Sequence, residues 1–186
     1  MPPKVKVTKE DIVNAAFNIV RKNGAAALNA RTIATTLGCS TQPVFSNFDS
    51  MQQLQLAVVA RADRLCADYI RQEVESGKFP VYKASGMAYI RYAREEPELF
   101  KLLYMRNRRN EPDCAGPTLN DQMESVVQRN TGLKEAEVKL FHLEMWAFVH
   151  GIAVMAATDF INLDEDLVSR MLTDAYLGMR KQYGLE

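Results

Sequence analysis

The chain has 186 residues, of which 47% are apolar, and a formal net charge of zero. This length and apolar content are enough for a sizeable core in one or two domains. The N-terminus "MPPKVKVTKED" lacks the apolar run of a secretory signal. The apolar run at residues 145–157 is too short to span a bilayer. The three cysteines do not have the spacing of a metal site. We therefore expect a cytoplasmic chain with reduced thiols, no membrane segment, no metal and no cofactor.

The charge is unevenly distributed along the chain. Residues 1–50 carry six basic and three acidic side chains, a net charge of +3, so the remainder carries −3. A basic segment is expected where a protein meets a polyanion such as nucleic acid. A chance fluctuation would give the same imbalance, so charge alone does not decide.

The first fifty residues predict three helices. A capping-box pattern at residues 8–11 begins the first helix, and Gly24 ends it. Asn29 is a good N-cap for a short second helix, which Gly38 stops. We expect Ser40 to cap a short third helix.

Longer apolar helices are predicted from residue 50 to the C-terminus. Their expected ranges are 51 to about 76, 81–94, a helix that opens at Pro97, 119–128, 134 to about 158, and 164 to about 183. We expect residues 106–117 to form a polar loop between two of them. Since no alternating strand pattern occurs, the predicted fold class is all-α.

The third predicted helix lies in the stretch "GCSTQPVFSNF", residues 38–48, and has few long apolar side chains. Two short helices joined by a tight glycine turn are typical of a helix-turn-helix, whose second helix enters the DNA major groove. We expect Thr41, Gln42 and Ser46 on the reading face. The opposite face would be anchored by Val44, Phe45 and Phe48, and Pro43 would occupy the third helical position, where no backbone N–H is needed. The alternative is an ordinary helical hairpin with a solvated polar face.

Residues 9–55 resemble the DNA-binding head of the tetracycline-repressor (TetR) family. The matching features occur in the same order: a helix, Gly24, the Asn29 cap, "IA" at 33–34, the Gly38 turn, an aromatic residue at Phe45, and "F-x-S" at 48–50. The segments "YIRYAREEPELFKLLY" and "MWAFVHGIAVM" resemble, more loosely, the bodies of a subgroup named for a Trp…His-Gly element. The resemblance implies a DNA-binding domain over residues 1–50 and a helical ligand-binding and dimerisation domain over 51–186.

The resemblance also implies which residues contact DNA. The expected set is Lys4, Lys6, Arg31, Thr32, Ser40, Thr41, Gln42, Pro43, Phe45, Ser46 and Asn47. Three positions depart from the family pattern: Phe45 replaces a usual tyrosine, Asn47 a frequent histidine, and Met51 a frequent lysine. Because phosphate neutralisation supplies most nonspecific DNA affinity, these departures predict weaker nonspecific binding.

The middle helices are expected to form a pocket for a mostly apolar small molecule, because their side chains are rich in aromatic rings and methionine. The expected lining residues are Tyr69, Met87, Ile90, Phe100, Leu103, Tyr104, Trp146 and His150. Trp146 and His150 are one helical turn apart and should touch. The competing interpretation is that both residues only pack in the core.

The last two predicted helices each carry more than one apolar stripe, whereas a surface helix of a monomer needs one. We therefore expect a homodimer held by a four-helix interface with two-fold symmetry. Its predicted residues are Phe141, Met145, Val149, Ala153, Ala157, Val168, Met171, Leu172, Ala175 and Met179.

The sequence thus predicts a DNA-binding transcriptional regulator, a repressor that an apolar effector releases from a palindromic double-stranded DNA operator. The first alternative is a helical interaction module that does not bind DNA. The second is a helical-bundle enzyme, although no local catalytic motif occurs around His142 or His150.

Overall fold

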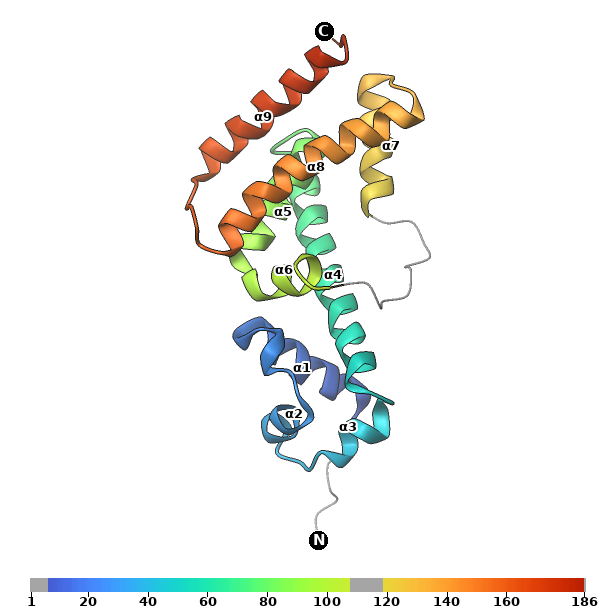
Figure 1. Ribbon diagram of the computed structural model, residues 1–186, viewed down its shortest axis with the longest axis vertical. Helices are drawn as coiled ribbons and strands as arrows, with labels where there is room; N and C mark the ends of the chain where they lie inside the picture. Colours follow the sequence, from blue (N-terminus) through green and yellow to red (C-terminus); the bar gives the residue numbers. More distant parts are fainter. Residues whose placement is uncertain (1–6, 108–118, 186) are drawn as a thin grey trace. The chain divides into compact units, whose positions relative to one another are not determined.

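The computed structural model describes residues 7–107 and 119–185, and every regular element within these ranges is helical (Figure 1). The elements are α1 (Lys9–Asn23), the short 3-10 helix η1 (Ala25–Ala27), α2 (Ala30–Leu37), α3 (Gln42–Asn47), α4 (Met51–Ser76), α5 (Val81–Glu95), α6 (Pro97–Tyr104), α7 (Leu119–Thr131), α8 (Glu135–Ala157) and α9 (Glu165–Gln182). This confirms the predicted all-α fold class. The η1 turn was not predicted. Lys4, Lys6 and most of the predicted polar loop lie outside the described residues.

Local capping signals set the first two helix ends as predicted. The Thr8 and Asp11 side chains exchange hydrogen bonds with each other's backbone N–H groups at 3.1 and 2.9 Å, which completes the capping box of α1. The Asn29 side chain accepts a hydrogen bond from the Thr32 N–H at 2.9 Å and caps α2. Gly38 ends α2 in the left-handed region, with φ of 63°, which glycine adopts without steric cost.

The start of α3 differs from the prediction. The helix begins at Gln42 with Thr41 as its N-cap, so Ser40 lies one residue outside the cap position. Pro43 is therefore the second helical residue and not the third. The first turn of a helix leaves its N–H groups without intrahelical partners, so the proline ring is tolerated at either position.

The chain forms two compact units. The first unit, called the head, comprises Met1–Leu65 and Glu96–Arg106. The second, called the body, comprises Cys66–Glu95 and Asn107–Glu186. By packing, α6 and the first part of α4 therefore belong with the three N-terminal helices. The boundary expected at residue 50 concerns function and stays a prediction.

The core of the head is closed by polar contacts between distant segments. Arg21 on α1 forms an ion pair with Glu96, whose side chain is only 4% exposed, and its Nε lies 2.6 Å from Glu96 Oε2. A buried carboxylate needs such a partner to remain charged. The Arg61 guanidinium lies 4.9 Å from the centre of the Phe17 ring and donates to Asn14 Oδ1. These contacts fix α6 and α4 against α1.

The core of the body is built around α8, which packs most extensively against α5. At Gly86 on α5, a Cβ atom would lie 3.0 Å from Leu172 on α9 and at an ordinary contact distance of 3.5 Å from Val149 on α8, so the glycine mainly leaves room for α9. Val138, Phe141, Met145, Val149, Ile152, Ala153 and Ala157 are all buried on this side of α8.

This burial corrects the predicted dimer interface. Seven of its ten residues are less than 9% exposed within the single chain: Phe141, Met145, Val149, Ala153, Ala157, Val168 and Leu172. Met171, Ala175 and Met179 are half-buried. Side chains that already fill the chain's own core are not available to a second chain, so an interface on these helices must use their outward faces.

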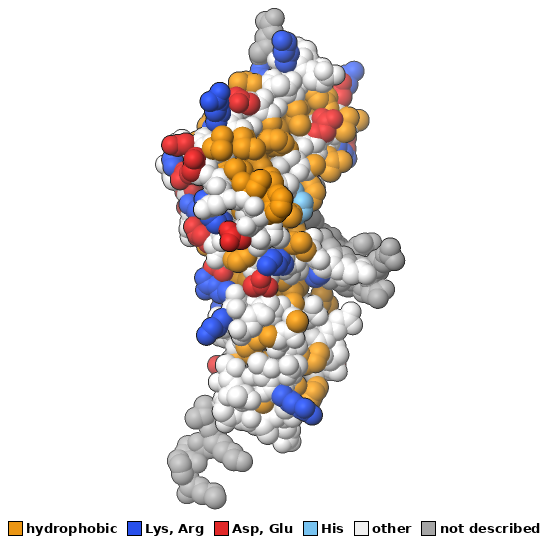
Figure 2. Space-filling view, turned by 60° about the vertical axis from the view of Figure 1, so that its left-hand side comes forward, with side chains coloured by type: hydrophobic (Ala, Val, Ile, Leu, Met, Phe, Trp, Pro, Cys, Tyr) orange, Lys and Arg blue, Asp and Glu red, His pale blue; other side chains and the backbone are white. Residues whose placement is uncertain are grey.

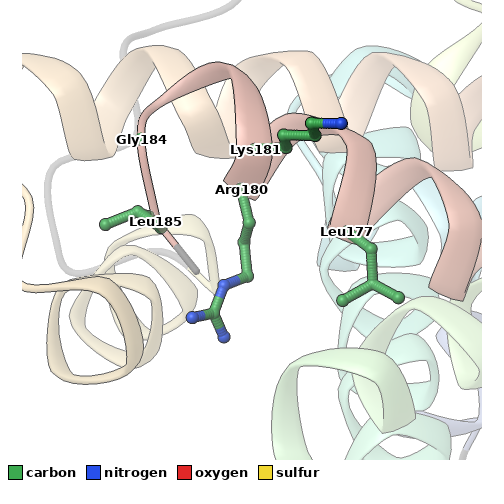
Figure 3. Close-up of a pocket in the computed structure, with 5 residues that line it drawn as sticks. All are labelled: Leu177, Arg180, Lys181, Gly184 and Leu185. Atoms are coloured by element: carbon green, nitrogen blue, oxygen red, sulfur yellow. The ribbon is translucent and has the colours of Figure 1, made fainter.

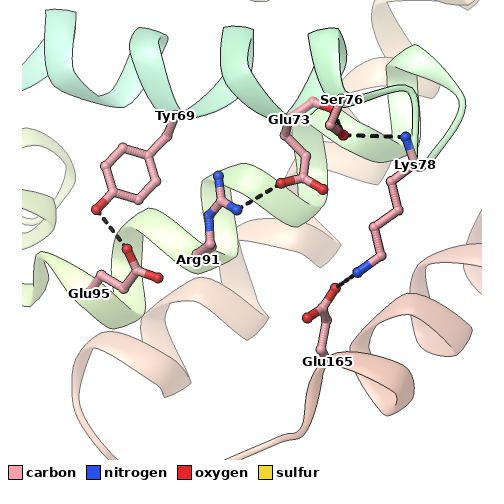
Figure 4. Close-up of polar contacts among 7 residues, drawn as sticks. All are labelled: Tyr69, Glu73, Ser76, Lys78, Arg91, Glu95 and Glu165. Carbon is pink, nitrogen blue, oxygen red and sulfur yellow. Dashed lines mark hydrogen bonds and ion pairs between the residues drawn. The ribbon is translucent and has the colours of Figure 1, made fainter.

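The body's helices are also joined by polar contacts at their edges (Figure 4). Tyr69 on α4 donates to Glu95 at 2.7 Å, and Arg91 on α5 pairs with the buried Glu73 of α4 at 2.8 Å. Lys78 pairs with Glu165 at the start of α9. Glu95 is thus bonded within the body, whereas its chain neighbour Glu96 is bonded within the head.

Of the helices in the described ranges, α8 is the one long and apolar enough to cross a membrane, by length and composition alone. This differs from the sequence-based expectation, which rested on the apolar run of residues 145–157. The helix that contains this run is longer, at 23 residues. Its buried stripe packs against α5, as in the core helix of a folded domain.

Two tyrosine–histidine hydrogen bonds connect α5 to α8. Tyr82 Oη lies 2.9 Å from His142 Nδ1, and Tyr89 Oη lies 2.9 Å from His150 Nδ1. Burial lowers the pKa of both histidines, and for His142 the charge of Glu124 acts weakly in the opposite direction. The body therefore holds both imidazoles in their neutral form at neutral pH.

These lowered pKa values predict acid sensitivity. Because the unfolded histidines titrate near about 6.5 and the folded ones below it, the unfolded chain takes up protons first as the pH falls. Their contribution to stability is complete above the unfolded pKa and is lost as the pH falls below it and through the lower pKa of the folded state. In urea unfolding at pH 7.5 and 5.5, His142→Gln should lose less stability between the two pH values than the wild type. An unchanged pH dependence would contradict this assignment.

Candidate nucleic-acid interface

The segment from α2 to α3 has the geometry of a helix-turn-helix. Gly38 closes α2, residues 38–41 make the turn, and α3 follows after it. Both helices pack on α1. Ile33 and Ala34 of α2, and Val44 of α3 with Phe48 just beyond it, are buried, which leaves the other side of each helix to solvent.

The solvent face of α3 carries Gln42, Phe45 and Ser46, at the helical spacing of three and four residues. Phe45 is 59% exposed, so its predicted role as an anchor to the core is wrong. Val44 and Phe48 fill that role at 1% and 3% exposure. The predicted Gln42 and Ser46 positions on the reading face are consistent with this geometry.

Some of the expected polar contacts are already engaged with the helix itself. Ser46 donates its hydroxyl to the Gln42 carbonyl at 2.9 Å, and Asn47 donates its amide to the Pro43 carbonyl at 2.8 Å. The Thr41 hydroxyl makes no capping bond. Gln42 is exposed, and its long amide side chain can both donate to and accept from a base edge.

The positive charge of this surface is modest within the described residues. Arg31, the second residue of α2, is exposed, while Thr32 beside it is half-buried. Lys9 is exposed at the start of α1, and its ammonium group lies 4.9 Å from the centre of the Phe48 ring. Met51, where the family pattern has lysine, is the first residue of α4.

The expected ligand-pocket residues fall in both units. Phe100, Leu103 and Tyr104 belong to α6 in the head, and the other five belong to the body. Within the body, Trp146 stacks on His150 with ring centres 4.7 Å apart, which confirms the predicted contact. Met87 and Ile90 are buried on α5, and Tyr69 is bonded to Glu95. Their role as a pocket lining stays a prediction.

An open hollow of about 540 Å³ lies elsewhere, at the C-terminal end of α9 (Figure 3). It is lined by Leu177, Arg180, Lys181, Gly184 and Leu185. None of the predicted pocket residues is among them. Within the described ranges, no group of His, Cys, Asp and Glu side chains is arranged to hold a metal ion.

Sequence reasoning singled out the two histidines but missed their tyrosine partners. Tyr82 and Tyr89 are seven residues apart on α5, and His142 and His150 are eight apart on α8. Both spacings are close to two helical turns, so this pattern could have indicated paired contacts between two parallel helices.

The fold and this surface define an all-helical protein with an N-terminal helix-turn-helix. Residues 82–175, half of the chain, match the family described as "Tetracyclin repressor-like, C-terminal domain". The chain therefore belongs to the tetracycline-repressor-like family of transcriptional regulators. The narrower Trp…His-Gly subgroup stays a prediction.

Individual relatives are distant. An uncharacterized helix-turn-helix transcriptional regulator of Mycobacterium tuberculosis is 23% identical over 167 residues, which cover 88% of this chain and 77% of that protein. A TetR-like regulator from Rhodococcus sp. RHA1 has a similar fold, with a TM-score of 0.67 at 14% identity over 99% of both chains. The multidrug binding protein EbrR, solved with imidazole, has a TM-score of 0.60 at 16% identity over 90% of this chain and 88% of its own.

The exposed position of Gln42 predicts a role in reading sequence. Gln42→Ala should weaken binding to the specific operator by about 1–3 kcal/mol and barely change binding to random DNA. Thr36→Ala is the matched control, because the Thr36 hydroxyl is bonded to its own helix at Thr32. Fluorescence anisotropy with both kinds of duplex measures the two affinities. Equal losses on both would mean that Gln42 only positions the protein.

Proposed function

We propose that this protein is a ligand-responsive repressor that binds a palindromic operator as a homodimer in the cytoplasm. The observation that carries the proposal is the helix-turn-helix whose α3 presents Gln42 and Phe45 to solvent while Val44 and Phe48 hold it to the core. A recognition helix needs this division between an anchored and a reading face. Membership of a family of regulators supports the same conclusion.

The dimer is proposed on the outward face of α8. Leu140, Leu143, Ala147 and Gly151 follow one another on this face, and the two leucines are 50% and 58% exposed. Figure 2 presents a patch of apolar side chains in its upper half, on the body. A helix that is apolar on both its inner and outer faces is expected to be covered on both.

Two glycines support close approach of a second chain. Gly151 on α8 and Gly178 on α9 lie inside helices and have open space where a Cβ would be. Glycine destabilises a helix interior by roughly 1 kcal/mol relative to alanine, and neither position needs it within the single chain. A partner helix that packs closely on these positions accounts for both.

The effector is proposed to be a small, mostly apolar molecule bound in the body. The buried surface of α5 and α8 supplies apolar and aromatic groups, and the Tyr89, His150 and Trp146 cluster supplies polar atoms beside them. An effector that prefers a different spacing of the two heads would lower DNA affinity, because it stabilises the form that does not fit the operator.

The direct test is selection of bound duplexes from a random library by the full-length protein. We expect enrichment of an inverted repeat whose half-sites lie about 34 Å apart, one turn of duplex. Failure to enrich any sequence would favour the alternative of an interaction module that does not bind DNA. Turnover of a substrate that depends on His150 or His142 would favour an enzyme.

The dimer proposal makes a prediction at Leu143. Leu143→Glu places a charge on the exposed face, so the chain should fold but become monomeric and lose most of its operator affinity. Val81→Glu is the matched control, since Val81 is 43% exposed at the start of α5. Light scattering at micromolar concentration reports the mass. A wild-type monomer, or a dimeric Leu143→Glu variant, would contradict the proposed interface.

The departure at Met51 makes a second prediction. If this position faces the DNA backbone, Met51→Lys should tighten binding to all duplexes. It should also steepen the salt dependence by about one counterion per subunit. Binding isotherms between low and moderate salt measure the slope. An unchanged slope would place Met51 away from the phosphates.

A further inference from the structure

An aromatic side chain lies exposed on the helix that is proposed to enter the major groove. Phe45 is 59% exposed, although it is flanked in the sequence by well-buried Val44 and followed by buried Phe48. Its backbone is fixed, because α3 is anchored through those two neighbours. The ring therefore projects from a held helix and contributes little to the core of the head.

Two polar side chains that follow Phe45 in the sequence already donate hydrogen bonds within α3. Ser46 uses its hydroxyl hydrogen within α3, and Asn47 donates to the Pro43 carbonyl. Pro43, the second residue of α3, is half-buried, and its ring is apolar. On the solvent face of α3, Phe45 is the apolar side chain, and of the two polar ones Ser46 already donates its hydroxyl hydrogen within α3, while Gln42 lies at the N-terminal end of the helix.

The phenyl ring of Phe45 lacks the hydroxyl group of the tyrosine that the family pattern usually has at this position. It has no hydroxyl to donate to a phosphate, so its exposure is not explained by contact with the DNA backbone. Covering an exposed phenyl ring with an apolar partner surface is favourable, because it removes apolar area from water. In the major groove, the apolar feature that base pairs present is the C5-methyl group of thymine.

We propose that Phe45 is a specificity-determining residue that packs its ring against a thymine methyl group in each half-site. This inference rests on the proposed DNA-binding function and adds to it the chemistry of one base position. Gln42 would read a neighbouring base pair through hydrogen bonds, so the recognition helix combines one polar and one apolar contact. The preferred operator then contains thymine at a fixed position, selected by its methyl group and not by hydrogen bonding.

The test compares thymine with uracil, which differs only by the absence of that methyl group. The operator is first obtained by selection with the wild-type protein, and each thymine of the half-site is then replaced in turn by deoxyuridine in both halves. At one position, the wild type should bind the uracil duplex about fourfold more weakly per half-site, which corresponds to roughly 0.8 kcal/mol for one buried carbon. Uracil elsewhere in the half-site should have little effect.

Two variants assign the effect to Phe45. Phe45→Ala should bind the thymine and uracil duplexes equally, while Phe45→Tyr, which keeps the ring, should preserve the preference for thymine. Because the ring is exposed, both variants should melt near the wild-type temperature, which circular dichroism verifies. Thr36→Ala, on the exposed side of α2, serves as the control that leaves the preference unchanged.

The outcomes separate this inference from the proposed function. A protein that binds its selected operator but binds the uracil duplexes with unchanged affinity at every position would overturn the role of the methyl group and leave the regulator intact. A thymine preference that survives in Phe45→Ala would assign the contact to another residue and also overturn the inference. Absence of any selected duplex would instead contradict the DNA-binding function itself.

Discussion

The packing of α8 against α5 is the constraint on which the body depends. Gly86 of α5 lies beside Val149 of α8, and a Cβ atom at this position would come within 3.0 Å of Leu172 on α9. Tyrosine–histidine hydrogen bonds at 2.9 Å lie on either side of this point along the helices. Both imidazoles form these hydrogen bonds in a mostly apolar region, which favours their neutral form. The hydrogen bonds in turn hold α5 and α8 in one register. The register in turn decides which face of α8 remains outside.

That outer face carries the proposed dimer contact. Because Phe141, Met145 and Val149 fill the core, Leu140 and Leu143 are left on the surface. A second copy that covers them would hold two heads together, and a pair of recognition helices reads an inverted repeat. The head is stabilised by a separate contact. Arg21 forms an ion pair with the buried Glu96, which is the first residue of the second chain segment that belongs to the head. The adjacent Glu95 is bonded to Tyr69 within the body, so neighbouring residues are held in different units.

Local signals in the sequence predicted the helices well. Asn29 and Gly38 end α2 through local effects, a side-chain hydrogen bond to a nearby backbone N–H and a left-handed backbone conformation. The ends of α2 could therefore be predicted from residue type alone. The start of α3 was misplaced by one residue, because Ser40 and Thr41 are both good caps and local preference does not choose between them. The 3-10 turn at Ala25–Ala27 has no distinctive sequence signal.

Tertiary choices were harder to predict. The sequence indicated two apolar stripes on α8, but hydrophobicity alone cannot say which stripe faces the core when both are apolar. The side chosen for the dimer, including Ala153, proved to be buried within the chain. Phe45 was expected on the face of α3 that anchors the helix to the core, because phenylalanine is one of the residue types most often buried. Its exposure became evident only once Val44 and Phe48 were seen to complete the anchor.

We expect this helix-turn-helix protein to occupy specific DNA in the cell as a regulator. Genome-wide mapping of the DNA bound by the full-length protein in its own cell tests this most directly. We expect a small number of discrete sites that share an inverted repeat and lie beside promoters, and the neighbouring genes would indicate the effector. Uniform background along the genome, with no enriched sequence at native protein levels, would contradict it.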